Sequence, residues 1–144
     1  MPILKREPVA HIVNTSSIFG IFAPPGQTSY SAAKFAVRGF SESLRHELEG
    51  SSVKLSVVHP GGIKTNIARS ARIGTNAKVE RLEQGLKNLE KSFMTTPEAA
   101  AEHIVRGVER DEPRILVGRD ALQVDWIQRL FPSTYWGVLK KVLR

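Results

Sequence analysis

The chain has 144 residues, of which 41% are apolar and 24% are charged. These proportions are typical of one soluble globular domain, and they exclude a disordered chain, a collagen-like repeat and a coiled coil. The absence of cysteine excludes a disulfide framework and a thiolate metal site. The sequence shows neither a signal peptide nor an apolar run long enough to span a bilayer, so we expect a cytoplasmic protein and treat 1–144 as a single domain.

The net charge of +7 raises the question of an anionic partner. A nucleic-acid-binding surface usually combines a basic stripe with interleaved aromatic side chains. This chain has no run of five like charges, and its most basic third, residues 51–100, contains Phe93 as its single aromatic residue. We therefore interpret the excess charge as solvated surface and expect no nucleic-acid partner.

Strands and helices alternate along the first half of the chain. Residues 10–16 are short, largely apolar or β-branched, and predict a buried strand that ends in a loop. A helix is predicted over 29–48, and Gly50 ends it. A second strand is predicted over 53–58. The helix prediction rests on apolar residues at helical spacing, which are Ala33, Ala36, Val37, Phe40, Leu44 and Leu48.

The second half continues the alternation. Residues 63–78 predict a loop and 79–93 a charged helix. Thr96 as N-cap, followed by Pro97, predicts the start of a helix that runs to about Arg110. The remaining predictions are a strand over 114–118, a helix over 120–130 and a helical tail within 120–144.

Strands joined by helices of ten or more residues imply right-handed β–α–β crossovers and a parallel sheet. The predicted fold class is therefore α/β. Three strands are few for a parallel sheet, whose strands are normally buried on both faces among more neighbours. We expect about half of a larger α/β fold.

Tyr30 and Lys34 are four residues apart, so they lie on one face of the predicted helix. A phenol with a pKa near 10 is a poor acid or base at neutral pH. An ammonium about 4 Å away contributes roughly 4 kcal/mol at an effective dielectric near 20, enough to bring such a pKa near 7. The spacing suits a proton donor and its electrostatic partner, although two surface residues on a helix would give the same pattern.

Three motifs occur in one order, each at or beside the carboxyl end of a predicted strand, where ligands bind in open α/β sheets. They are Ile-Val-Asn-Thr-Ser-Ser at 12–17, Tyr-Ser-Ala-Ala-Lys at 30–34 and His-Pro-Gly-Gly-Ile-Lys-Thr at 59–65. This combination resembles the short-chain dehydrogenase/reductase family. The resemblance covers residues 10–65 closely and continues more loosely over 114–121, which is similar to the last core strand of the family. It implies a Rossmann-type, doubly wound fold, of which this chain matches the C-terminal half.

The resemblance also implies roles for individual residues. Tyr30 would be the general acid/base, Lys34 would assist it and bind the nicotinamide ribose, and Ser17 would hold the substrate oxygen. Residues 63–95 would form a lid over the substrate. The residues that would line the nicotinamide of NAD or NADP are Pro60, Gly61, Ile63 and Thr65.

The sequence departs from the family pattern in one respect. Family members carry a Gly-rich turn that cradles the pyrophosphate at a helix N-terminus. No two glycines in this chain are two residues apart. The part of the family pattern that selects NAD or NADP is also absent, so the sequence leaves that choice open.

Other kinds of site have weaker support. The four histidines, His11, His46, His59 and His103, lack the spacing of metal ligands, and we interpret them as strand-end or surface residues. Ser17 lies outside any G-x-S-x-G motif, which argues against a hydrolase. The aromatic and basic tail over 126–144 could lie on an anionic membrane, but packing on the body of the protein or on a partner is favoured.

We therefore expect the catalytic half of an NAD(P)-dependent oxidoreductase that transfers hydride between nicotinamide and an alcohol or carbonyl substrate. The alternatives are a truncated, inactive interaction module and, less favoured, a basic nucleic-acid- or membrane-binding protein. Small residues at Ala32, Ala33, Ala36 and Gly39 would permit another helix to approach the Tyr30 helix, and the family resemblance implies a homo-oligomer. The 144-residue chain alone is expected to be inactive, because it lacks the pyrophosphate turn.

Overall fold

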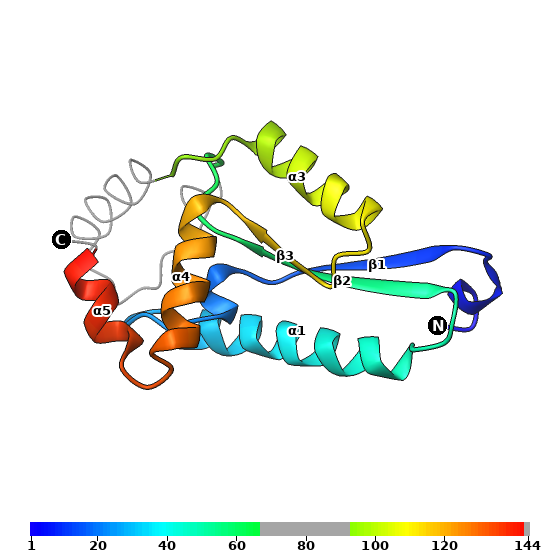
Figure 1. Cartoon of the computed structure of the whole chain (residues 1–144), viewed down its shortest axis with the longest axis horizontal. Helices are drawn as coiled ribbons and strands as arrows, with labels where there is room; N and C mark the ends of the chain where they lie inside the picture. The colour runs from blue at the N-terminus through cyan, green and yellow to red at the C-terminus, as the bar shows by residue number, and fades with distance from the viewer. Residues whose placement is uncertain (67–92, 143–144) are drawn as a thin grey trace, which may run out of the picture.

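The computed structural model describes residues 1–66 and 93–142, and three parallel strands in the order β1-β2-β3 form its sheet (Figure 1). The α/β fold class and the parallel sheet are confirmed. The strands are β1 (Ala10–Thr15), β2 (Val53–Pro60) and β3 (Arg114–Val117). The helices are α1 (Thr28–Glu47), α3 (Pro97–Glu109), α4 (Arg119–Leu130) and α5 (Tyr135–Val142), and the short 3-10 turns are η1 (Leu4–Arg6) and η2 (Ile18–Gly20).

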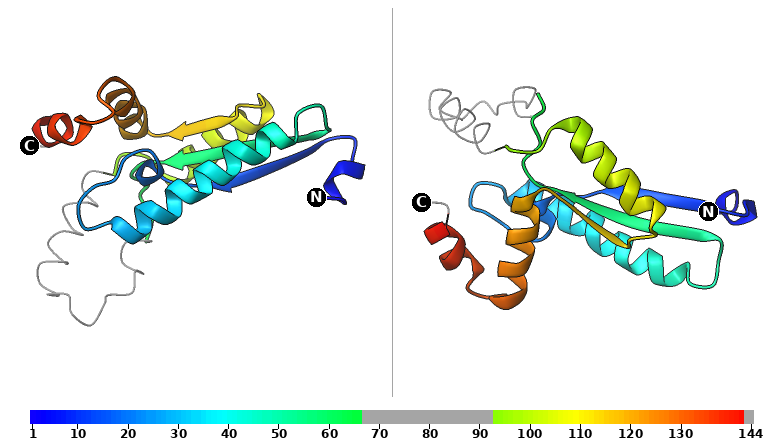
Figure 2. Two further views of the ribbon diagram at one scale, coloured as in Figure 1. Left: turned by 90° about the horizontal axis from the view of Figure 1, so that it is seen from below. Right: turned by 45° about the horizontal axis from the view of Figure 1, so that its top comes forward.

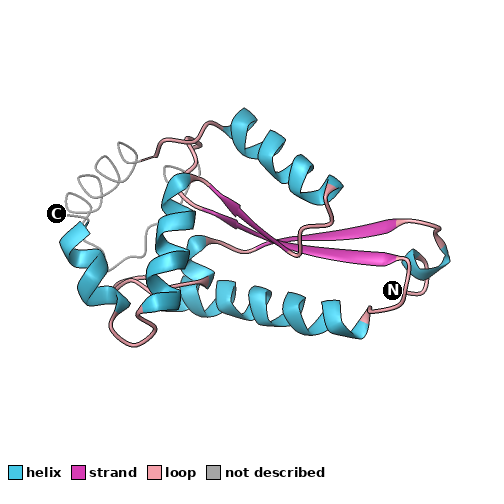
Figure 3. Ribbon diagram, in the orientation of Figure 1, coloured by secondary structure: helices cyan, strands magenta, loops and turns pink. Residues whose placement is uncertain are grey.

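Each strand or helix predicted within the described residues is present (Figure 3). The ends of each element differ from the prediction by at most two residues. Thr96 caps α3 as predicted, because its hydroxyl accepts a hydrogen bond from the backbone N–H of Ala99 at 3.2 Å. Most of the predicted loop over 63–78, of the predicted helix over 79–93 and of the predicted lid over 63–95 lies outside the described residues.

Helices cover both faces of the sheet, as the views in Figures 1 and 2 show. Leu55 of β2 packs with Leu44 of α1, whereas Val58 of β2 packs with Ala100 of α3 on the opposite face. Both connections step across the sheet in the same direction, from β1 to β2 and from β2 to β3. Helices on opposite faces then give the two crossovers opposite hands. The prediction that the crossovers are all right-handed is therefore wrong for one of them.

The first strand is an edge strand and is only partly buried. β1 pairs with β2 along one side, and within the described residues its other side has no neighbouring strand. Ala10 and Ile12 pack towards α1, but the side chain of Val13 on the other face is 41% exposed. The prediction of a buried strand is wrong, because α3 covers β2 and β3 and leaves this face of β1 open. The most buried strand is β2, in which only Lys54 is exposed and Pro60 is half-buried.

Helix α1 presents an unexpected face to the sheet. Two of its serines, Ser31 and Ser41, are buried, and Ser41 accepts a hydrogen bond from the side-chain amide of Asn14 on β1 at 3.0 Å. Phe40 is 62% exposed. Of the apolar residues that predicted this helix, only the C-terminal ones, Leu44 and Leu48, join the core beneath the strands. The helix was predicted correctly, but much of its apolar stripe faces away from the sheet.

The C-terminal helices pack on the body of the protein. Leu139 of α5 is 3% exposed and belongs to a core cluster with Ile21, Phe22 and Val124. Trp126 and Leu130 on α4 remain exposed. No helix in the described part of the chain combines the length and apolar character needed to cross a membrane.

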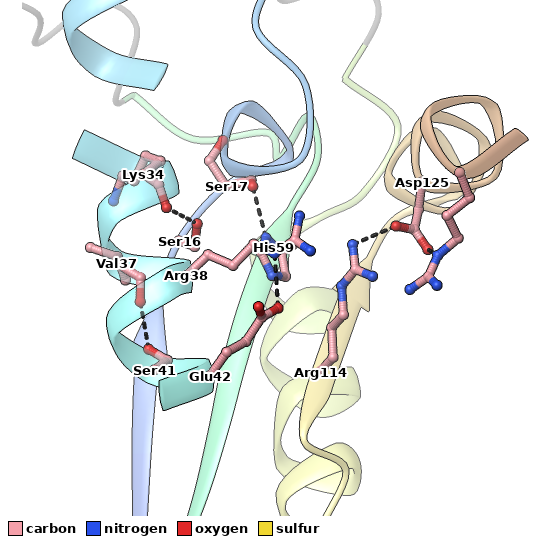
Figure 4. A network of polar contacts seen from close by, with 11 residues as sticks. Ser16, Ser17, Lys34, Val37, Arg38, Ser41, Glu42, His59, Arg114 and Asp125 are labelled. Carbon is pink, nitrogen blue, oxygen red and sulfur yellow. Dashed lines mark hydrogen bonds and ion pairs between the residues drawn. The ribbon is translucent and has the colours of Figure 1, made fainter. Parts of the chain in front are cut away.

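A charged cluster joins β3 to α4. Asp125, whose side chain is 10% exposed, accepts a hydrogen bond from the guanidinium group of Arg114 (Figure 4). It accepts another from the guanidinium group of Arg129. Arg114 is similarly buried, whereas the side chain of Arg129 is 56% exposed. Burial lowers the pKa of Arg114, and the negative charge of Asp125 opposes that change.

We predict that Asp125→Ala destabilises the fold by about 3 kcal/mol, because it leaves the guanidinium of Arg114 buried without its counter-charge. Arg129→Ala is the matched control and should cost less than about 1 kcal/mol, since this partner is solvated. Urea unfolding followed by circular dichroism measures both. Equal losses in the two variants would contradict this account.

Candidate active site

Ser17 is the second residue after β1, at the carboxyl edge of the sheet. It is the N-cap of η2, and its Oγ accepts a hydrogen bond from the backbone N–H of Phe19 at 3.1 Å. The residue is 8% exposed. The turn thus fixes the hydroxyl at the point where β1 ends.

Lys34 on α1 contacts the end of the same strand in two ways. Its Nζ donates a hydrogen bond to the carbonyl oxygen of Thr15 at 3.1 Å. Its own carbonyl oxygen accepts a hydrogen bond from the Oγ of Ser16 at 2.8 Å (Figure 4). The residue before Ser17 is therefore tied to the helix that carries Lys34.

Gly20 permits this close packing of η2 on α1. A Cβ at this position would lie 2.3 Å from the Oγ of Ser16 and 2.8 Å from the carbonyl oxygen of Lys34. Real Cβ atoms essentially never approach other atoms within 3.0 Å. Any other residue would therefore push the Ser17 turn away from the helix.

Tyr30 lies one turn before Lys34 at the start of α1, and its side chain is partly exposed. The Nζ of Lys34 lies 5.6 Å from the centroid of the Tyr30 ring, within the range of a cation–π contact. The ring also meets Phe19 edge to face, with 5.9 Å between the centroids. Ser17, Tyr30 and Lys34 are thus grouped around the end of β1 through their neighbours.

The end of β2 and the loop after it contain the four other predicted site residues, which are Pro60, in the strand, and Gly61, Ile63 and Thr65, in the loop. The backbone N–H of Gly61 donates to the carbonyl oxygen of Val117 at 2.8 Å. Ile63 forms an isolated parallel bridge with Thr95, and its side chain packs in the cluster with Val58 under α3. The loop therefore lies at the carboxyl edge of the sheet, beside the start of α4.

His59, the residue before Pro60, is a buried member of the site that the sequence interpretation missed. It is the penultimate residue of β2, close to the strand end as expected, but it is 0% exposed. Its Nδ1 donates a hydrogen bond to the carbonyl oxygen of Ser17 at 2.9 Å (Figure 4). The available signal was its place in the His-Pro-Gly-Gly motif at the end of an apolar strand.

Burial lowers the pKa of His59 from 6.5 to about 4, although the hydrogen bond to Ser17 opposes the shift. Arg114 and Arg38 lower it further, and Glu42 acts in the other direction. Burial would raise the pKa of Glu42, but the hydrogen bond from Arg38 and nearby arginine charges lower it overall. The Nε2 of His59 is buried and has no hydrogen-bond partner within the described residues, so a second proton there would be unsatisfied.

The described residues contain no group of three side chains that could hold a metal ion. Asp111, His11 and Ser56 do align in the order of a hydrolase triad. Ser56 is 0% exposed, however, and its hydroxyl donates to the carbonyl oxygen of Glu112. A substrate cannot reach this serine. The contacts among these three side chains therefore stabilise the sheet and do not form a hydrolytic site.

The family described as short chain dehydrogenase matches residues 1–76 of this chain. The protein SadH of Mycobacterium tuberculosis is 44% identical over 127 residues, which are 87% of this chain and 45% of that protein. Oxidoreductase BOA17 of Botryotinia fuckeliana is 34% identical over 131 residues, 85% of this chain and 48% of that protein.

Solved structures of the same family share the fold. A short-chain dehydrogenase/reductase from Burkholderia phymatum, solved in complex with NAD, superimposes with a TM-score of 0.73 at 24% identity and covers 90% of this chain and 50% of its own. A Burkholderia cenocepacia enzyme in complex with NADP gives a TM-score of 0.69 at 22% identity, with 99% and 51% covered.

The class of protein follows from these matches and from the structure. The structure has a parallel α/β sheet with a serine, a tyrosine and a lysine grouped at its carboxyl edge. The chain belongs to the short-chain dehydrogenase family, and the two relatives named above are described as oxidoreductases. It spans about half the length of the curated relatives it matches. The fold is accordingly the Rossmann-type fold of that family, and this chain contains about half of it.

We predict that His59 makes the stability of the fold depend on pH. The unfolded state binds a proton at the ordinary pKa of 6.5 and the folded state at about 4. Between these values the unfolded state binds more protons, so the contribution of His59 is complete above pH 6.5 and is lost as the pH falls towards 4. The loss is at most about 3 kcal/mol.

Urea unfolding between pH 4 and 7 measures this slope. His59→Asn should flatten it, whereas His46→Gln, at an exposed histidine of α1, should leave it unchanged. An unaltered slope in His59→Asn would refute the assignment.

Proposed function

We propose that these residues form the catalytic half of a nicotinamide-dependent oxidoreductase that acts on an alcohol or a carbonyl compound. The observation that carries the proposal is the position of the Lys34 ammonium, which is held at the end of β1 and over the ring of Tyr30. This placement brings a cation and a phenol together beside Ser17, at the edge of the sheet where ligands of open α/β folds bind.

In this proposal Tyr30 is the general acid/base, and its partial exposure leaves the hydroxyl open to a substrate. Ser17 donates a hydrogen bond from its Oγ to the substrate oxygen and so stabilises the charge that develops there. Within the described residues the hydroxyl makes one hydrogen bond, from the N–H of Phe19, in which it is the acceptor, so its own proton is available to the substrate. Lys34 stabilises the phenolate that Tyr30 becomes when it gives up its proton.

The residues present suit a nicotinamide cofactor. An ammonium has three donors, and within the described residues the Nζ of Lys34 makes one hydrogen bond, to Thr15, so donors remain for ribose hydroxyls. The backbone of Pro60, Gly61 and Ile63, with the side chain of Thr65, would bind the nicotinamide end. When bound, the cofactor supplies or accepts the hydride. NAD and NADP are both compatible, and solved relatives bind one or the other.

The sequence contains no Gly-x-Gly turn for the pyrophosphate. We therefore propose that the activity belongs to a full-length form that includes such a turn, and that the 144-residue chain alone has none. The alternative function, an inactive interaction module, is supported by the open side of β1, which leaves backbone groups available for pairing. Calorimetric titration of NADH and NADPH into the full-length form distinguishes the two functions. We also propose a cytoplasmic location.

The principal prediction is that Tyr30→Phe in the full-length form lowers kcat by about 100-fold or more, because only the transferable proton is lost. Cofactor affinity should be nearly unchanged. Lys34→Ala should reduce both kcat and cofactor affinity, and Ser17→Ala should lower kcat with a milder effect on the cofactor. Steady-state kinetics with NADH or NADPH and a panel of small carbonyl compounds measures these effects.

Tyr135→Phe is the matched control. It removes the other phenolic hydroxyl of the chain, which accepts a hydrogen bond from the backbone N–H of Ala23. Its turnover should stay close to that of the unmodified protein. Turnover in Tyr30→Phe equal to that of this control would exclude the mechanism.

The outward face of α1 supports a homo-oligomer. Two aromatic side chains lie near the small residues of this helix, and both are exposed: Phe40 is 62% exposed and Phe35 is 40% exposed. Beside Phe35 a cavity of about 570 Å³ opens between α1 and Trp136 of α5. An exposed apolar helix face of this kind is typical of a protein–protein interface.

We predict that Phe40→Glu converts the oligomer to a monomer, since it places a charge on this face without disturbing the core. Sedimentation velocity at tens of micromolar, roughly the range in which micromolar contacts persist, measures the change. Val105→Glu is the control on the exposed face of α3. A monomeric parent protein would contradict the proposed interface.

A further inference from the structure

Asp120, in the first turn of α4, contacts the loop that follows β2. Its Oδ2 accepts a hydrogen bond from the backbone N–H of Gly62 at 2.6 Å. A carboxylate at the N-terminal end of a helix is stabilised by the partial positive charge there. The contact joins two segments that are far apart in the sequence, at the edge of the sheet where Ser17 and Tyr30 lie.

Two glycines make room for the Asp120 carboxylate. A Cβ at Gly61 would lie 2.2 Å from each of its oxygens, and a Cβ at Gly118 would lie 2.5 Å from Oδ1. Gly118 also has a φ of 101°, a conformation that other residues rarely adopt. The carboxylate therefore occupies the space of two absent side chains, so the identities of Gly61 and Asp120 depend on each other.

The same loop is held on its other side by Thr95. The backbone N–H of Lys64 donates to the carbonyl oxygen of Thr95 at 2.9 Å, and Ile63 bridges to that residue. These contacts fix the loop after Ile63. Before Ile63, the hydrogen bond of Gly61 to Val117 and that of Gly62 to Asp120 hold the backbone. The ring of Phe93 also packs against Gly62, but Asp120 makes the only side-chain hydrogen bond to the Gly61–Gly62 backbone in the described part of the chain.

We propose that Asp120 is a positioning residue that sets the backbone conformation of the Gly61–Gly62 turn and thereby the surface that this loop offers to the nicotinamide cofactor. The second part rests on the proposed function, which assigns the loop to the cofactor. Asp120 itself touches neither the reacting atoms nor the cofactor. Its loss should therefore weaken cofactor binding while the chemistry at Tyr30 continues.

The first test uses the 144-residue chain labelled with ¹⁵N and needs no cofactor. In Asp120→Ala the Gly62 amide proton should lose the downfield shift of a carboxylate-bonded N–H, and its hydrogen exchange should accelerate at least tenfold. Asp120→Asn should restore slow exchange to within threefold of the parent, because the amide oxygen can accept the same bond. Gly61→Ala should reproduce the effect of Asp120→Ala by displacing the carboxylate.

Glu98→Ala is the matched control. Glu98 is the exposed acidic residue in the first turn of α3, so its removal alters a helix terminus without touching the loop. In Glu98→Ala, the Gly62 amide proton should keep the chemical shift and the exchange rate that it has in the unsubstituted chain. If Gly62 exchanges at the parent rate in Asp120→Ala, or equally fast in Glu98→Ala, then Asp120 does not position the turn.

The second test uses the turnover assay of the full-length form. Asp120→Ala should raise the KM for the cofactor about tenfold and change kcat less than twofold. An unchanged KM alongside fast Gly62 exchange would overturn the link between the turn and the cofactor. Failure of Tyr30→Phe to lower turnover would instead overturn the proposed function, and the Gly62 measurements would still decide whether Asp120 sets the turn.

Discussion

Lys34 holds the end of β1 through both its side chain and its backbone. The ammonium binds the carbonyl of Thr15, and the carbonyl of Lys34 binds the hydroxyl of Ser16. These two contacts determine how far Ser17 lies from α1, and the absence of a Cβ at Gly20 lets them form. The same side chain lies over the ring of Tyr30. One lysine therefore contributes to the architecture of the site and to its electrostatics, so its substitution would affect both at once.

The polar inner face of α1 complements the site. Ser41 receives the amide of Asn14, and Arg38 pairs with Glu42 beside His59 on the same side of the sheet. Hydroxyl and ionic contacts fix the rotation of this helix about its axis more specifically than apolar contacts would, because hydrogen bonds depend on direction. The rotation directs Tyr30 and Lys34 towards the end of β1. It also leaves the small and aromatic residues of the helix facing outward.

The order and extent of the strands and helices could be predicted from periodicity, glycine and proline, because these signals are local. The motifs that contain Ser17, Tyr30 and Lys34 could likewise be found from spacing. Burial could not be predicted in the same way. Whether Val13 or Phe40 is exposed depends on which elements cover β1 and α1, and apolar residues alone do not specify this. His59 and Asp120 were missed because their partners, Ser17 and Gly62, lie 42 and 58 residues away in the chain.

The opposite hands of the two crossovers explain how so few elements enclose β2. If both connections had the same hand, α1 and α3 would lie on one face, as in a singly wound sheet. Val58, Ile115 and Val117 would then face solvent, although each is at most 1% exposed here. Burial of such side chains contributes roughly 1.5–3 kcal/mol each. A single reversal of winding direction thus places β2 between two helices, one from each connection. The strand that carries His59 and Pro60 near its end is therefore covered by a helix on each face.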